Sequence, residues 1–103
     1  MWVLFRVPTP TPDGRTARDL YDFRVQAITP EMQASARAHG CRFHQAWHAD
    51  DGSALYALAQ WESLAGARAF LAEWQIADEP GETVTILRGH VGTAPLPVGP
   101  DEE

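Results

Sequence analysis

The residues best suited to chemistry are concentrated in the segment from Cys41 to Trp61. This segment holds the only cysteine, two of the four tryptophans, and two of the four histidines, His44 and His48. A neutral imidazole in a partly apolar pocket can exchange protons near neutral pH, which is the chemistry of a general base. We predict that His44 is this base, and that His48, which lies closer to a turn, contacts a ligand.

A β-hairpin is predicted to carry these residues, because Asp51-Gly52 lies between two strand-like runs. Asp-Gly is preferred in a two-residue type I′ turn, which requires positive φ at both central residues. The resulting register places His44 opposite Ala59 and Arg42 opposite Trp61. A four-residue loop would give the same register, whereas a loop with an odd number of residues would not.

One face of the predicted hairpin combines titratable groups with small residues. Because side chains alternate along a strand, this face carries Arg42, His44, Ala46, His48, Leu55, Ala57, Ala59 and Trp61. Alanines leave room beside the polar groups, which is typical of a ligand pocket. We predict that Arg42 or Arg88 stabilises an enolate or phenolate oxygen when His44 removes a proton, and that Trp61 bounds the ring of the ligand.

The opposite face of the hairpin is aromatic. Trp47 and Tyr56 form a predicted cross-strand pair, worth about 0.5–1 kcal/mol, and such a pair is most often part of a core or a dimer interface. On the last predicted strand, Arg88 and His90 share one side. The predicted ligand-binding set consists of Trp61, His48, Tyr56, Trp47 and His90.

Metal binding is disfavoured by the same strand geometry. His44 and His48 lie four residues apart, which separates their Cα atoms by about 13 Å on a strand. Alternation also places Cys41 on the opposite face, so the Cys-x2-His-x3-His string is a weak zinc signature. Cys41 at the start of a strand is most often a small core residue. No phosphate loop or dinucleotide fingerprint is present, and we predict neither a metal nor a cofactor.

The composition narrows the classes of partner. The net charge of −6 disfavours binding to nucleic acid and to anionic membrane surfaces. No apolar run approaches the length of about 20 residues that a membrane helix needs, and the first residues do not resemble a secretion signal. A single cysteine agrees with a reducing compartment. We expect a cytoplasmic protein, and because arginine supplies every basic residue, we expect it to come from a GC-rich bacterium.

Turn signals and hydrophobic periodicity divide the remainder of the chain into further elements. We predict a strand over Trp2–Val7, a Pro-rich loop, a helical arm over Thr16–His39 broken at Pro30, the hairpin, a helix from Ser63 to Trp74 and a strand over Val84–His90. Tyr21, Phe23 and Val25 also alternate like a strand, and the helix is the interpretation that we favour. Residues 1–92 form one predicted domain, and residues 93–103 form a Pro/Gly-rich, acidic tail.

The predicted order β-α-β-β-α-β is that of a ferredoxin-like α+β fold, with an antiparallel sheet and helices on one face. The other face of such a sheet needs a cover. In a short chain rich in aromatic residues, a second copy of the chain is the simplest cover, so we predict a homodimer.

The chain resembles the dimeric α+β barrel superfamily, which includes antibiotic-biosynthesis monooxygenase-like domains and small uncharacterised bacterial families. The resemblance is carried by Gly40–Trp47, the Asp51-Gly52 turn, Tyr56–Ser63 and Ala69–Trp74. It implies a homodimer with an apolar pocket between the sheet and the helices. The superfamily spans cofactor-free monooxygenases, isomerases, cyclases, haem enzymes and proteins without known activity. No catalytic motif transfers residue by residue.

Three functional hypotheses follow from these observations. The leading one is a homodimer that binds a small aromatic or polyketide-like molecule and, if catalytic, performs cofactor-free oxygenation, isomerisation or cyclisation. The alternative is a non-catalytic metal- or ligand-binding protein of the same fold. A third is a structural or regulatory partner whose aromatic face docks another protein.

Overall fold

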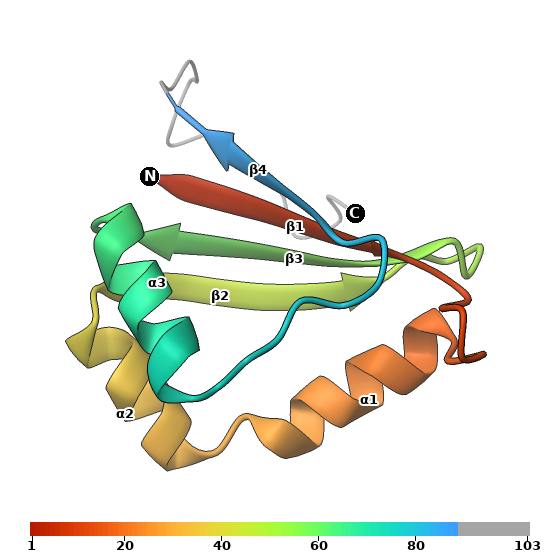
Figure 1. Cartoon of the computed structure of the whole chain (residues 1–103), viewed down its shortest axis with the longest axis horizontal. Helices are drawn as coiled ribbons and strands as arrows, with labels where there is room; N and C mark the ends of the chain where they lie inside the picture. Colours follow the sequence, from red (N-terminus) through yellow and green to blue (C-terminus); the bar gives the residue numbers. More distant parts are fainter. Residues whose placement is uncertain (89–103) are drawn as a thin grey trace, which may run out of the picture.

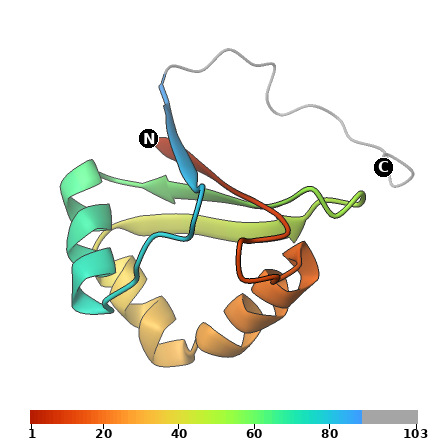
Figure 2. The same ribbon diagram turned by 45° about the vertical axis from the view of Figure 1, so that its right-hand side comes forward.

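The computed structural model describes residues 1–88, and these residues form an α+β domain (Figure 1). The elements follow the order β1 (Trp2–Pro8), α1 (Ala17–Ala27), α2 (Pro30–Ala38), β2 (Cys41–His48), β3 (Ala54–Trp61), α3 (Leu64–Glu73) and β4 (Thr83–Leu87). The four strands form one antiparallel sheet in the order β2-β3-β1-β4. The helices all lie on one side of this sheet (Figures 1 and 2). The predicted fold class is confirmed.

The predicted helical arm consists of two helices, which begin at the caps that the sequence indicates. The Thr16 side chain accepts a hydrogen bond from the backbone N–H of Asp19, and the Asp19 carboxylate accepts one from the N–H of Thr16. This reciprocal capping box favours the helix over the alternating strand pattern. Thr29 caps α2, with Pro30 at its first turn. Thr29 is extended, as a residue before proline prefers, and the chain therefore bends between the helices.

The hairpin loop is wider than predicted. The backbone N–H of Ala49 donates to the carbonyl of Ala54, and the N–H of Gly52 donates to the carbonyl of Ala49. Gly52 has φ of 75°, whereas Asp51 does not have positive φ. The predicted type I′ turn is therefore wrong, and residues 50–53 form a four-residue loop. Because this loop leaves the register unchanged, Trp47 still pairs with Tyr56 and His44 with Ala59.

A bulge at the start of β2 changes the register there. Cys41, rather than Arg42, pairs with Trp61, and Phe43 pairs with Gln60, so Arg42 is an extra residue. The predicted pairing of Arg42 with Trp61 is wrong. Because of the bulge, Cys41 lies on the same face of the sheet as His44, whereas alternation predicted the opposite face. Its partner Trp61 and the partner of His44, Ala59, share that face. Strict alternation cannot reveal this inserted residue.

The last strand ends earlier than predicted. β4 ends at Leu87, whereas the predicted strand continued to His90. His90 and the predicted tail over residues 93–103 lie outside the described residues. Within residues 1–88, no helix is long and apolar enough to cross a membrane.

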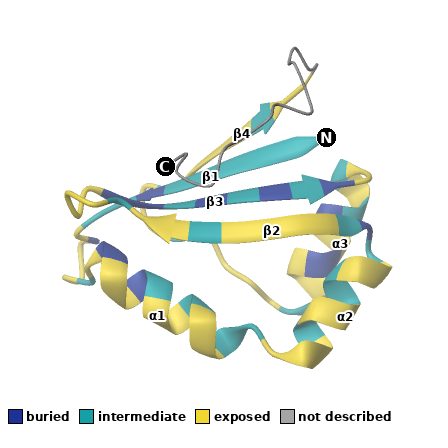
Figure 3. Cartoon of the chain, turned by 180° about the vertical axis from the view of Figure 1, so that it is seen from behind, coloured by how far each residue is buried: buried dark blue, intermediate teal, exposed yellow. Residues whose placement is uncertain are grey.

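The buried core lies between the sheet and the helices, in two clusters. One cluster contains Ala59, Trp61, Ala67 and Phe70, and the other contains Val7, Leu20 and Leu55. The central strand β3 supplies buried residues to both, whereas the edge strand β2 is mostly exposed (Figure 3). Among residues 1–88, no helix lies on the outer face of the sheet.

Candidate ligand cavity

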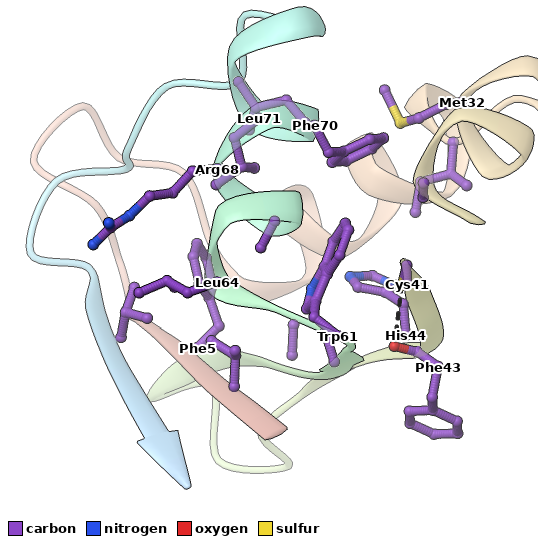
Figure 4. Close-up of a pocket in the computed structure, with 18 of the residues that line it drawn as sticks. Phe5, Met32, Cys41, Phe43, His44, Trp61, Leu64, Arg68, Phe70 and Leu71 are labelled. Atoms are coloured by element: carbon purple, nitrogen blue, oxygen red, sulfur yellow. Dashed lines mark hydrogen bonds between the residues drawn. The ribbon is translucent and has the colours of Figure 1, made fainter. Parts of the chain in front are cut away.

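A cavity of about 830 Å³ lies between the inner face of the sheet and the helices. Its walls come from all four strands, all three helices and the α3–β4 linker of the described chain (Figure 4). Small side chains on β3, Ala57 and Ala59, form part of its roof, as predicted from the hairpin pattern. A second pocket of about 230 Å³ lies beside it, between α1 and β2. The main cavity has the size of a small-molecule site.

An aromatic wall closes one side of the cavity. The rings of Trp61 and Phe70 have centroids 5.5 Å apart, and Trp61 is only 8% exposed. Figure 4 shows the two rings side by side at the cavity, with Leu71 and Met32 nearby. This position of Trp61 allows it to bound an aromatic ring, as the sequence suggested.

His44 lies in the wall formed by β2. Its side chain lines both the main cavity and the smaller pocket, so it is reached from either space. The pKa of His44 is lowered, first by desolvation among the surrounding protein atoms and second by the positive charge of Arg24. Both effects disfavour the imidazolium. The neutral imidazole therefore predominates at neutral pH, which is the form that a general base requires.

Arg24 lies on the same boundary, on helix α1. Like His44, it lines both the cavity and the smaller pocket. The guanidinium stacks on Phe5, with its central carbon 5.2 Å from the ring centroid. Desolvation lowers the pKa of Arg24, and this effect outweighs the attraction to Glu82 and Glu79, which raises the pKa. Arg24 is not among the site residues predicted from the sequence, although a signal existed: it lies one turn from Leu20 and one turn from Ile28 on the apolar side of the helix.

An acidic side chain also borders the cavity at the start of β4. Glu82 is half-buried, and its carboxylate accepts a hydrogen bond of 2.8 Å from the backbone N–H of Glu79. The pKa of Glu82 is raised mainly by desolvation. The segment is fixed to the β1–α1 loop because Arg15 donates to the Glu79 carboxylate at 2.8 Å and also pairs with Asp13.

The two arginines that we predicted to stabilise an anion lie in different places. Arg42 lines the cavity at the bulge, and its guanidinium pairs with the Glu62 carboxylate. Arg88 is exposed just after β4 and does not line the cavity.

The predicted ligand-binding residues are divided between the two faces of the sheet. Trp61 lines the cavity, whereas Trp47 and Tyr56 pair on the outer face, where Arg6 donates to the Tyr56 hydroxyl at 3.3 Å. His48 packs edge-on against Tyr21, with ring centroids 5.2 Å apart, and lines neither pocket.

Cys41 lies on the cavity wall as a thiol. Its Sγ donates to the carbonyl of Phe43 at 3.4 Å, and desolvation raises its pKa. Figure 4 shows the Phe43 ring pointing away from the cavity. Within residues 1–88, no group of three or more histidine, cysteine, aspartate or glutamate side chains is arranged to hold a metal ion. The His39 side chain bonds to the Glu73 carboxylate at 3.1 Å.

The fold and the cavity together define a ferredoxin-like α+β domain with an internal pocket. No protein-family model matches the chain, and no curated protein matches it. Among solved structures, Rv0793 from Mycobacterium tuberculosis is similar over 88% of this chain and 97% of its own, with 21% sequence identity and a TM-score of 0.50. This similarity shows that the two proteins share a fold.

Proposed function

We propose that this protein binds a small, largely apolar aromatic molecule in the cavity and that His44 acts on it as a general base. The observation that carries the proposal is the position of the His44 imidazole in the wall of a cavity of about 830 Å³ that the Trp61–Phe70 wall also borders, and the lowered pKa of His44 favours its neutral form. A neutral imidazole that faces a ligand bound in this cavity can accept a proton from it.

The chemistry would begin with transfer of a proton from an acidic carbon of the ligand to the free ring nitrogen of His44. The carbanion would be delocalised as an enolate or phenolate. Such a step needs no cofactor and can lead to isomerisation, cyclisation or reaction with dioxygen. Arg42 lines the cavity and is the predicted cation that can face the resulting oxygen anion, whereas Arg88 does not line it.

Hydrogen–deuterium exchange tests the proposed base directly. The probe is β-tetralone, a bicyclic ketone with acidic protons beside its carbonyl group, incubated in heavy water and followed by NMR. We expect the protein to accelerate exchange and His44→Gln to abolish the acceleration. The matched control His48→Gln should retain it, because His48 lines neither pocket. Equal rates for His44→Gln and the unmodified protein would refute the base assignment.

A binding protein without catalysis is the second candidate. It is favoured by the pairing of Arg42 with Glu62, which neutralises the cation expected to stabilise an anion. In this case β-tetralone would quench tryptophan fluorescence in a saturable manner without accelerated exchange. Saturable quenching shows that the compound binds, and the exchange rate then separates a binding site from a catalytic one.

We also propose that a second copy of the chain covers the outer face of the sheet. This face presents Trp47, 43% exposed, Phe43, 38% exposed, and Leu87, 41% exposed. The rings of Trp2 and Phe43 meet there at 5.4 Å between centroids. An apolar sheet face of this kind is self-complementary in a two-fold dimer, because both copies present the same patch.

A further inference from the structure

Arg24 differs from the other arginines around the cavity. Arg37, Arg42 and Arg68 also line it, but their side chains are exposed, whereas Arg24 is half-buried. Within residues 1–88, no carboxylate lies within salt-bridge distance of the Arg24 guanidinium, and no hydrogen bond to it is formed. A half-buried guanidinium without an anionic partner is energetically unfavourable unless another group supplies the missing hydrogen bonds.

The guanidinium nitrogens of Arg24 can be reached from the cavity. The described residues contain no fully buried side-chain nitrogen or oxygen that lacks a hydrogen-bond partner, so the unpaired nitrogens of Arg24 keep contact with open space. Arg24 lines both the cavity and the adjoining pocket, so an acceptor bound in either space can approach it. The guanidinium carbon lies over the Phe5 ring, and this cation–π contact leaves the N–H groups available to an incoming acceptor.

We propose that Arg24 is the anchor for a carboxylate of the ligand, and that the ligand is an aromatic carboxylic acid. This inference rests on the proposed ligand cavity and deepens it. A planar carboxylate matches the forked N–H geometry of arginine and can accept two parallel hydrogen bonds. The Trp61–Phe70 wall provides the aromatic surface for the remainder of the molecule.

The surrounding charges favour a carboxylate over a phosphate. Glu82 and Asp78 line the same cavity, and Glu82 is close enough to Arg24 to influence its protonation. A group with two negative charges would be repelled by these acids more strongly than a single carboxylate would be. The neutral state of His44 adds no second cation at this position. The other arginines that line the cavity, Arg37, Arg42 and Arg68, are exposed and screened by water, so Arg24 is the half-buried cation that a single carboxylate would meet.

The test compares naphthoate with its methyl ester, which has the same ring system without the charge. Binding to the whole chain is measured by tryptophan fluorescence and by calorimetry. We expect the protein to prefer naphthoate by about 10- to 100-fold, as a charge-assisted bidentate contact contributes. Arg24→Met should remove this preference and keep the affinity for the ester. The retained affinity for the ester would also show that the variant is folded.

The matched control is Arg68→Gln, which removes an exposed arginine from the same cavity. It should retain most of the preference for naphthoate, because an exposed charge is screened by water and salt. Arg24→Lys, which keeps the charge but not the forked geometry, should show an intermediate preference.

The outcomes separate this inference from the proposed function. Equal affinities of the unmodified protein for naphthoate and its ester would overturn the carboxylate assignment and leave the ligand cavity standing. An equal loss in Arg68→Gln and Arg24→Met would also overturn it, because general attraction would then explain the preference. Failure of both compounds to bind the unmodified protein would overturn the ligand cavity and, with it, the inference.

Discussion

His44 and Arg24 both border the cavity and the smaller pocket, and the charge of Arg24 contributes to the lowered pKa of His44. Arg24 stays protonated, so its positive charge makes protonation of His44 less favourable. Desolvation acts on the imidazole in the same direction and is the larger cause. The pair therefore combines a neutral proton acceptor with a fixed positive charge, which is useful when an anion forms between them.

This relation predicts the titration of His44. Its pKa should lie below the ordinary value of 6.5, and base-dependent exchange should rise with pH through that lowered pKa, since only the neutral imidazole accepts a proton. Arg24→Met should raise the pKa towards 6.5 without reaching it, because desolvation remains. NMR titration of the imidazole ring protons measures both values. An unchanged His44 pKa in Arg24→Met would contradict the proposed electrostatic coupling.

The two residues also show how far single residues can be predicted from the sequence. His44 could be placed on the cavity face because strand alternation depends only on register, and the wider hairpin loop preserved that register. Arg24 was assigned to a helix correctly, but its role depends on which space the helix borders. That space is created by packing between elements distant in the sequence, and no local pattern specifies it.

Close packing of α2 against α3 depends on one glycine in α3. A Cβ atom added to Gly66 would lie 2.1 Å from the backbone carbonyl oxygen of His39. Gly66→Ala should therefore destabilise the protein by about 1–3 kcal/mol, because the backbone of one helix end must move. Urea unfolding measures this loss.

The control for that substitution measures helix propensity, which favours alanine over glycine and therefore opposes the steric cost of Gly66→Ala. Ala69→Gly, at an exposed position in the middle of α3, should cost about 1 kcal/mol through propensity alone. By the same propensity, Gly66→Ala would be stabilising. A stabilised Gly66→Ala variant would show that α2 and α3 do not approach as closely as described.

The same two helices are joined by a polar network around Glu73. Its carboxylate accepts hydrogen bonds from the Ser35 hydroxyl at 2.6 Å and from His39 Nε2 at 3.1 Å, while Trp74 Nε1 donates to the Ser35 hydroxyl at 2.8 Å. The pKa of Glu73 is lowered, first by Ser35 and then by His39. A carboxylate with a lowered pKa stabilises the folded state above its ordinary pKa.

The stability that depends on Glu73 should therefore decline as the pH falls from the ordinary pKa of 4.5 through the lowered folded-state value. Glu73→Gln should remove this part of the pH dependence and should be less stable than the unmodified protein at neutral pH. The free energy of unfolding measured by urea at several pH values provides the comparison. Glu62→Gln is the control for loss of an exposed carboxylate elsewhere. Parallel pH profiles for Glu73→Gln and the unmodified protein would contradict the role of the network.

Elements were predicted well where a cap or a breaker marks them, and less well where geometry depends on strand pairing. Thr16, Thr29 and Ser63 each cap a helix at a place where the sequence predicts a helix to begin or break, because an N-cap side chain acts on its own backbone two or three residues ahead. The bulge at Arg42 has no comparable local signal. It arises where β2 leaves Gly40, whose φ of 99° and hydrogen bond to Glu62 N–H fix the start of the strand.

At the scale of the whole molecule, the two faces of the sheet have different surroundings, which the sequence pattern separated but could not assign. Alternation distinguished the Trp47–Tyr56 face from the His44–Trp61 face. Only the helix packing shows that the second face encloses the cavity, whereas no helix within residues 1–88 covers the first. Helices covering one face of an antiparallel sheet leave the other for water or for a partner.

The proposed homodimer forms through the outer face of the sheet, so we predict that negative charges introduced on this face separate the two copies. The unmodified protein should have twice the chain mass of 11.4 kDa in multi-angle light scattering. The double variant Phe43→Glu/Trp47→Glu should be a folded monomer, because both side chains are already exposed in the single chain and burying carboxylates between copies is costly. Phe23→Glu places a charge at a position of α1 that is 65% exposed, on the helical side, and should leave the dimer intact. A monomeric unmodified protein, or a double variant that remains dimeric, would show that this face is not the interface.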